Sequence, residues 1–148
     1  MLQSPFSKLS RSSERNLTIG LLILLLVTIS AMLFFDSFLK NDIAKNGIVS
    51  FELAKDLETS KAILNSWNEK GKIAASLSMG LDFLFLMIYA SFIALLIHKL
   101  NERLWKNKSF YYIGSMLVWA AFIMALADTI ENIALIRLLL NDFHFLPT

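Results

Sequence analysis

The chain has 148 residues, of which 56% are hydrophobic and 18% charged, and its formal net charge is +2. Soluble domains contain about 45–50% apolar and about 25% charged residues, so this composition predicts an integral membrane protein. The basic residues are few and scattered over several segments, which argues against a nucleic-acid-binding protein. The sequence has no cysteine, which excludes disulfides, thiolate nucleophiles and cysteine-ligated metals.

Residues 1–16 are polar and rich in serine, and we interpret them as a flexible N-terminal tail. The remaining residues, 17–148, are predicted to form one membrane-embedded helical domain. Residues 17–35 contain no charged side chain. A membrane-spanning helix needs about 20 apolar residues, whereas the apolar region of a signal peptide has about 7–15. Residues 17–35 are therefore predicted to be an uncleaved first transmembrane helix.

Residues 36–72 form the one long polar stretch of the sequence. Its apolar side chains recur close to helical spacing at Leu53, Leu57, Leu64 and Trp67. This pattern predicts a single amphipathic helix over about residues 50–70, with Ser50 as its N-cap and Gly71 as its stop. Charged residues interrupt the stretch too often for a transmembrane helix, so we expect it to lie outside the hydrocarbon.

Two further apolar segments follow, residues 73–97 and 110–127, separated by a basic loop over 99–108. The simplest interpretation of residues 128–141 is a helical extension of the third transmembrane helix. The alternative is a turn at Asp128 and a short helix that folds back along the membrane interface. The predicted fold class is all-α: three transmembrane helices and one amphipathic extramembrane helix in a small helical bundle.

The distribution of lysine and arginine predicts the orientation, because loops rich in these residues stay in the cytoplasm. The two sides of the predicted topology carry seven basic residues each. Seven are concentrated in the N-terminal tail and the 99–108 loop, whereas the other seven are spread over a longer loop and tail. We therefore expect a bacterial inner-membrane protein with its N-terminus in the cytoplasm and its C-terminus outside.

This topology brings three carboxylates to one predicted level near the outer boundary of the membrane. Asp82 precedes an apolar run that would place it about 22 Å from the inner end of its helix, and Asp128 follows the third span after about 27 Å. Asp128, Glu131 and Asn132 share one helix face because they are three and four residues apart. The candidate binding residues are therefore Asp82, Asp128, Glu131 and Asn132, with Glu52, Trp67 and Arg137 from the same side.

Each candidate also has a purely structural interpretation. Asp82 fits equally well as an interfacial residue whose side chain reaches water. Residues 128–132 fit almost equally well as the point at which a helix leaves the membrane. Trp67 is most simply a membrane-surface anchor. No metal site is predicted because the sequence lacks the Glu-x-x-His pairs of bundle metal sites, and His98 and His144 are interpreted as interfacial residues.

These observations favour a non-catalytic accessory or ligand-binding subunit whose acidic cluster binds a cation, a polar lipid headgroup or a basic partner. The alternative is an intramembrane enzyme that uses Asp82 and Asp128 as an acid–base pair on a lipid or peptide. The sequence names no cofactor. Three helices enclose little volume, so the expected partners, besides the bilayer, are further copies of the chain or a larger membrane complex.

Overall fold

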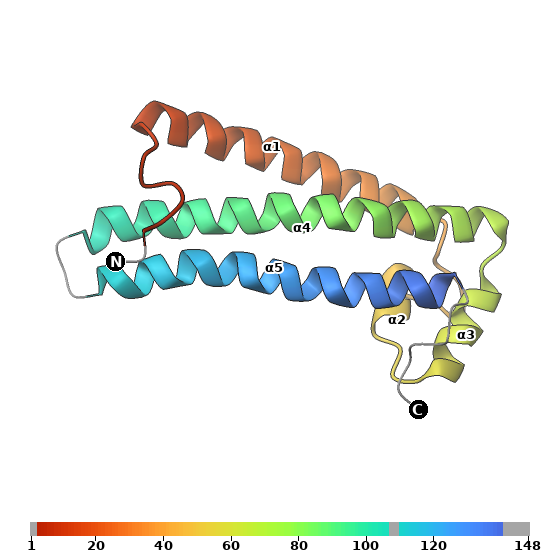
Figure 1. Cartoon of the computed structure of the whole chain (residues 1–148). Coiled ribbons are helices and arrows are strands. Elements are labelled where there is room, and N and C mark those ends of the chain that lie inside the picture. The colour runs from red at the N-terminus through yellow and green to blue at the C-terminus, as the bar shows by residue number, and fades with distance from the viewer. Residues whose placement is uncertain (1–2, 107–109, 141–148) are drawn as a thin grey trace. The chain divides into compact units, whose positions relative to one another are not determined.

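A computed structural model of the chain describes residues 3–106 and 110–140 (Figure 1). These residues are predominantly helical, and they contain no strand. The helices, in chain order, are α1 (Arg11–Asp36), α2 (Ile48–Glu52), α3 (Leu57–Ser66), α4 (Glu69–Leu104) and α5 (Tyr111–Leu139). The predicted all-α fold class is confirmed at this level.

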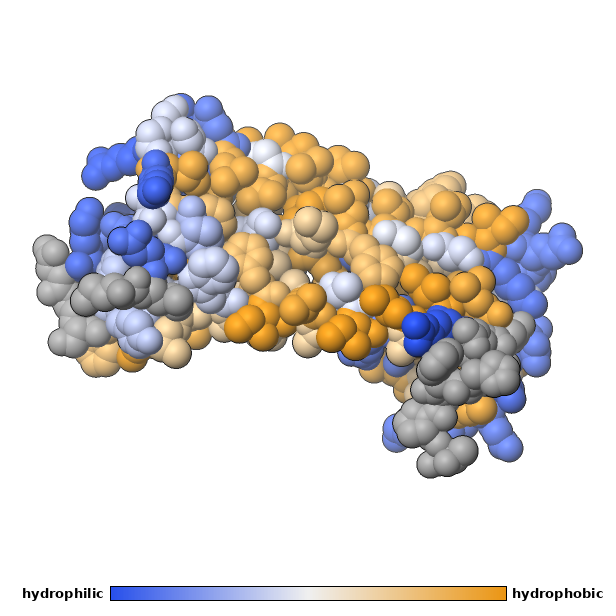
Figure 2. All heavy atoms as spheres, viewed as in Figure 1, coloured by the Kyte–Doolittle hydropathy of each residue, from blue (hydrophilic) through white to orange (hydrophobic). Residues whose placement is uncertain are grey.

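Three of the helices, α1, α4 and α5, are long and apolar enough to cross a membrane. They contain nearly all of the three predicted spans, residues 17–35, 73–97 and 110–127. Their apolar side chains are largely exposed; Val27 on α1 is 60% exposed and Met124 on α5 is 68% exposed. Figure 2 shows these apolar side chains along the visible faces of the long helices. Such faces suit a lipid environment better than water.

The helix boundaries differ from the predicted ones at both ends of the chain. α1 begins at Arg11, inside the segment predicted as a tail, because the Ser10 hydroxyl accepts a hydrogen bond from the Ser13 N–H at 3.1 Å and caps the helix. α4 continues to Leu104, through much of the predicted 99–108 loop. α5 continues without a turn at Asp128 as far as Leu139, which confirms the extended third helix over the fold-back alternative. Residue 141, which ends the predicted extension, lies outside the described residues.

The chain groups into two compact units, each formed from two separate segments. Unit 1 consists of Met1–Val27 and Phe85–Thr129, and unit 2 of Thr28–Leu84 and Ile130–Thr148. The prediction of one embedded domain over residues 17–148 assigned no such division.

Unit 1 includes the segment that precedes α1. The Trp119 indole N–H donates to the Gln3 carbonyl at 3.0 Å. The ring of Phe6 lies 5.9 Å from that of His98 and 6.5 Å from that of Phe122. The segment is thus packed against α4 and α5 through aromatic contacts.

Unit 2 has a compact apolar core, to which α2 contributes Ile48 and Phe51 and α3 contributes Ile63 and Leu64. Phe51, Ile63 and Trp67 are each less than 5% exposed, and they pack with Leu39 and Met79 in one cluster. The Trp67 indole N–H donates to the Leu39 carbonyl at 2.9 Å, which satisfies its polar atom inside the core. Trp67 is therefore a core residue, and the prediction that it anchors the chain at a membrane surface is wrong.

The single amphipathic helix predicted over residues 50–70 is also wrong, because two side chains start new helices within it. The Asp56 carboxylate accepts from the Thr59 N–H at 2.7 Å and caps α3. The Asn68 side chain accepts from the Gly71 N–H at 2.9 Å at the start of α4, so Gly71 lies inside a helix rather than after one. Ser50 lies within α2 and is not its N-cap.

Candidate functional site

The candidate site in unit 2 depends on a contact between Asp36 and the turn before α2. Asp36, the last residue of α1, is buried, and its carboxylate accepts from the Ile48 N–H at 2.8 Å and pairs with Lys40 at 3.1 Å. Gly47 has φ +59, and a Cβ added there would lie 1.9 Å from the Asp36 Oδ1 atom. Only glycine allows this approach, which fixes the direction in which α2 leaves the turn.

Glu52 ends α2 and is half-buried. Burial raises the pKa of its carboxyl group above the ordinary value, and the negative charges of Asp82, Glu131 and Asp36 raise it further. A carboxylate that is repelled by three other carboxylates lies in a region of concentrated negative charge. The structure therefore brings together three of the sequence-predicted site residues, Glu52, Asp82 and Glu131, which come from α2, α4 and α5.

Asp82 and Asn132 connect α4 to α5 within this region. The Asn132 side-chain amide donates to the Asp82 carboxylate, and Asn132 is 9% exposed. An amide that donates to a carboxylate holds it in place without neutralising its charge. We refer to Glu52, Asp82, Glu131 and Asn132 as the acidic cluster.

The acidic cluster resembles a charged surface more than a chelating site. Within residues 3–106 and 110–140, no three side chains of histidine, cysteine, aspartate or glutamate are grouped closely enough to hold a metal ion. The carboxylates are instead distributed over three helices, with Glu131 exposed and Glu52 half-buried. This arrangement can attract and pair with positively charged groups one carboxylate at a time.

Two other predicted site residues take different places. Trp67 lies in the core of unit 2, where its ring centroid is 5.7 Å from that of Phe51 on α2. Arg137 is exposed in the last turn of α5, where a cation is favourable beside the negative end of the helix dipole.

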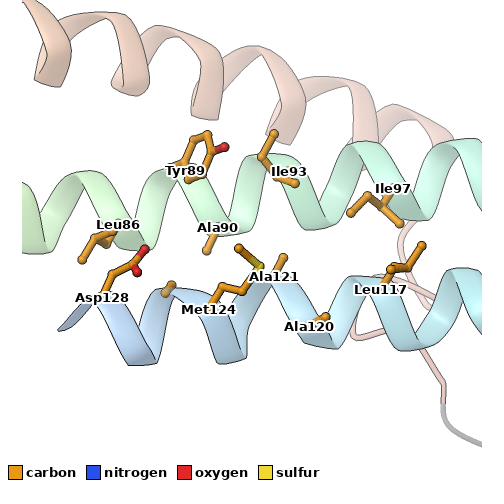
Figure 3. A pocket seen from close by; sticks show the side chains of 11 residues that line it. Leu86, Tyr89, Ala90, Ile93, Ile97, Leu117, Ala120, Ala121, Met124 and Asp128 are labelled. Carbon is orange, nitrogen blue, oxygen red and sulfur yellow. The ribbon is translucent and has the colours of Figure 1, made fainter. Parts of the chain in front are cut away.

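Asp128 belongs to unit 1, where it lines a cavity of about 200 Å³ between α4 and α5. Figure 3 shows its carboxylate at one end of this cavity, beside Leu86. Alanines form much of the lining, Ala90 on α4 and Ala120 and Ala121 on α5. Small residues of this kind let membrane helices approach closely. Among the described residues that line it, Asp128 is thus the single carboxylate, and nearly all of the others are apolar.

Sequence reasoning missed Asp36 as a residue of the site. Its position directly after an apolar run made it appear to be only the end of a transmembrane helix. The sequence contains both Asp36 and Gly47, but it does not show that the Asp36 carboxylate and the turn at Gly47 lie in contact. His98, interpreted as interfacial, is buried at 2% exposure, and His144 lies outside the described residues.

Comparison of the chain with known proteins identifies no relative. No protein-family model matches the chain, and no curated protein or solved structure matches it either.

Proposed function

We propose that this chain is a small integral membrane protein with three transmembrane helices, in a bacterial inner membrane. At 1.5 Å per residue, the 26 residues of α1, 36 of α4 and 29 of α5 extend about 39, 54 and 43 Å. Each exceeds a hydrocarbon thickness of about 30 Å. The density of lysine and arginine in the N-terminal segment and after residue 98 supports a cytoplasmic N-terminus and an outer C-terminus.

Its function is to bind, without catalysis, a positively charged group at the acidic cluster, as an accessory or ligand-binding subunit. The observation that carries this proposal is the grouping of Glu52, Asp82 and Glu131 in unit 2, with Asp82 held by Asn132. Burial and the charges of Asp82, Glu131 and Asp36 raise the pKa of Glu52 there. Carboxylates held close together are destabilising until a cation compensates them. A bound cationic group would relieve this repulsion.

The occupant that fits best is a lysine or arginine of a partner membrane protein, either a further copy of this chain or another subunit. A metal ion needs several ligands around one point, whereas a basic side chain pairs with one or two carboxylates. The acidic cluster has one carboxylate on each of three helices: Glu52 on α2, Asp82 on α4 and Glu131 on α5. A polar lipid headgroup or a free cation remains a competing occupant that the experiment distinguishes.

The test compares two pairs of substitutions in the tagged full-length chain, purified from its native membrane in mild detergent. Glu52→Gln with Glu131→Gln removes two carboxylates of the acidic cluster. Glu58→Gln with Glu69→Gln removes two exposed carboxylates of unit 2 outside it. We expect the wild type and the control to retain the same partner at a fixed stoichiometry, and the cluster variant to lose it.

Equal retention by both variants, or purification of the wild type with no stoichiometric partner, would contradict this function. Recovery of a bound amine-bearing lipid in place of a protein would identify the headgroup as the occupant and overturn the partner assignment.

The enzymatic alternative requires Asp82 and Asp128 to share a proton as an acid–base pair. Asp82 accepts a hydrogen bond from Asn132, and Asp128 lines the cavity of unit 1. Neither observation favours the alternative, and we do not propose it.

A further inference from the structure

Unit 1 contains a second cavity, of about 880 Å³, between the start of α1 and the end of α4. Among the described residues, four cationic side chains line it: Arg11, Lys99, Arg103 and Lys106. Two carboxylates of the same described set, Glu14 and Glu102, line it as well. The lysines and arginines described in the lining therefore outnumber the carboxylates by two. Figure 2 shows hydrophilic side chains gathered at this end of the helices.

The two lysines of the cavity have partners within unit 1. Lys106 pairs with Glu102 at 3.4 Å, and the Lys99 ammonium donates to the Thr18 hydroxyl at 3.2 Å. Neither Arg11 nor Arg103 forms an ion pair with a carboxylate in the part of the chain that the structure describes. The guanidinium groups of Arg11 and Arg103 therefore line the cavity without an ion-paired carboxylate among the described residues. The forked donors of a guanidinium group match the oxygens of a carboxylate or a phosphate.

His98 forms part of the wall of the same cavity. Its side chain is 2% exposed, and its Nε2 atom lies 3.6 Å from the Glu14 carboxylate. This contact joins the start of α1 to the end of α4, the two elements that carry Arg11 and Arg103.

The lining also has an apolar part, formed by Leu9, Leu96 and Leu100. A cavity that combines basic and apolar side chains at the end of membrane-spanning helices fits an amphiphile with an anionic head. We infer that this cavity binds a phosphate-bearing anion through Arg11 and Arg103, and the leucines favour an anionic lipid as its source. None of these residues belongs to the acidic cluster, so this inference rests on the proposed membrane insertion of the long helices but not on the proposed binding at the acidic cluster.

The experiment uses the full-length chain in mild detergent and native mass spectrometry to measure bound ligand. Three probes are added separately: phosphatidylglycerol, phosphatidylcholine and inorganic phosphate. The test variant is Arg11→Gln with Arg103→Gln. The matched control is Lys45→Gln with Lys55→Gln, which removes the same charge at exposed positions of unit 2.

We expect the wild type and the control to bind phosphatidylglycerol at one site and at least about tenfold more tightly than phosphatidylcholine. We expect the test variant to bind phosphatidylglycerol at least about tenfold more weakly than the control, because it loses two charge-assisted contacts. Binding of inorganic phosphate without the lipid, lost in the same variant, would support the site and identify a soluble anion as its source.

Equal binding of the two lipids by the wild type, with no phosphate bound, would overturn the inference without reference to any variant. Unchanged phosphatidylglycerol binding in the test variant would overturn it too. If that variant fails to fold, Arg103→Lys keeps the charge but removes the fork, and its affinity should fall between the wild type and a full loss. An affinity equal to that of the wild type would contradict the role of Arg103.

Discussion

Unit 1 and unit 2 are built from the same three long helices but are stabilised in different ways. Unit 2 packs α2 and α3 into an aromatic core in which Phe51 and Trp67 are almost completely buried. Unit 1 exposes most of its large apolar side chains and gathers its polar contacts at the ends of its helices. The buried core of unit 2 is typical of a water-soluble protein, whereas the exposed apolar side chains of unit 1 are typical of helices in contact with lipid.

The two units also differ in the charge of their candidate sites. The acidic cluster of unit 2 concentrates carboxylates around Glu52, whereas arginines and lysines outnumber carboxylates among the described residues that line the large cavity of unit 1. One short chain thus presents groups of opposite charge from two differently built parts.

The largest expected effect tests whether unit 2 has a true core. Trp67→Ala should lower the free energy of unfolding by about 3–5 kcal/mol, because it removes a buried aromatic side chain and its hydrogen bond to Leu39. Trp119→Ala in unit 1 is the matched control, since that ring is 40% exposed. It should cost about 1 kcal/mol, mainly the hydrogen bond to Gln3. Chemical denaturation followed by circular dichroism measures both, and equal losses would contradict the contrast.

A smaller effect tests the close approach between Gly47 and the Asp36 carboxylate, which positions α2. Gly47→Ala should cost about 1–3 kcal/mol, because alanine disfavours φ +59 and its Cβ would overlap the Asp36 carboxylate. Gly80→Ala, within α4, is the control, because nothing lies within 4 Å of a Cβ added there. It should be neutral or stabilising by about 0.5–1 kcal/mol. A Gly47→Ala variant as stable as the wild type in the same denaturation assay would show that the Asp36 contact does not fix the turn.

The smallest effect concerns the pH dependence of unit 2. The folded-state pKa of Glu52 is raised, so the folded chain binds this proton more tightly than the unfolded chain does. Its contribution to stability is fully present below the ordinary glutamate pKa and is lost as the pH rises through the raised value. Glu52→Gln should therefore stabilise the chain at pH 7 by on the order of 0.5 kcal/mol, a small gain because solvent screens a half-exposed group.

The advantage of Glu52→Gln should disappear near pH 4, where the wild-type carboxyl group is protonated. Glu58→Gln, at an exposed position of α3, should give no such gain at either pH. Thermal unfolding of the three proteins at both pH values checks this, and a wild type more stable than Glu52→Gln at pH 7 would contradict the repulsion. A variant that gains stability while losing its partner would show that the acidic cluster serves binding at the expense of the fold.

The sequence predicted the long helices well, because uninterrupted apolar runs are a strong local signal. It also predicted the continuation of α5 past Asp128, since no glycine or proline interrupts it. It failed over residues 50–70, where Asp56 and Asn68 act as helix caps. The leucine spacing suggested one helix, although Leu53 is 72% exposed and Leu64 is buried. Cap geometry is decided by tertiary packing as much as by residue type.

The candidate site was predictable only in part. Helix depth and spacing predicted a common level for Asp82, Asp128 and Glu131, with Glu52 on the same side. The charges of Asp82 and Glu131 raise the pKa of Glu52, whereas Asp128 lines the cavity of unit 1. The contact between Asp36 and Gly47 could not be derived, because it depends on how the chain returns after α1. The basic cavity of unit 1 was also missed, since Arg11 and Arg103 are far apart in sequence and their meeting is a property of the fold.

The central claim is that α1 crosses the membrane, with the basic N-terminal segment in the cytoplasm and the polar segment after α1 outside. Because the chain has no cysteine, a single introduced one reports its own side. Ser7→Cys and Asn46→Cys, both at exposed positions, should be labelled with a membrane-impermeant maleimide in intact cells and again after permeabilisation. The account predicts that Asn46→Cys reacts in intact cells and that Ser7→Cys reacts only after permeabilisation. Reaction of both from the same side would show that α1 does not span the membrane, and the reverse pattern would contradict the orientation.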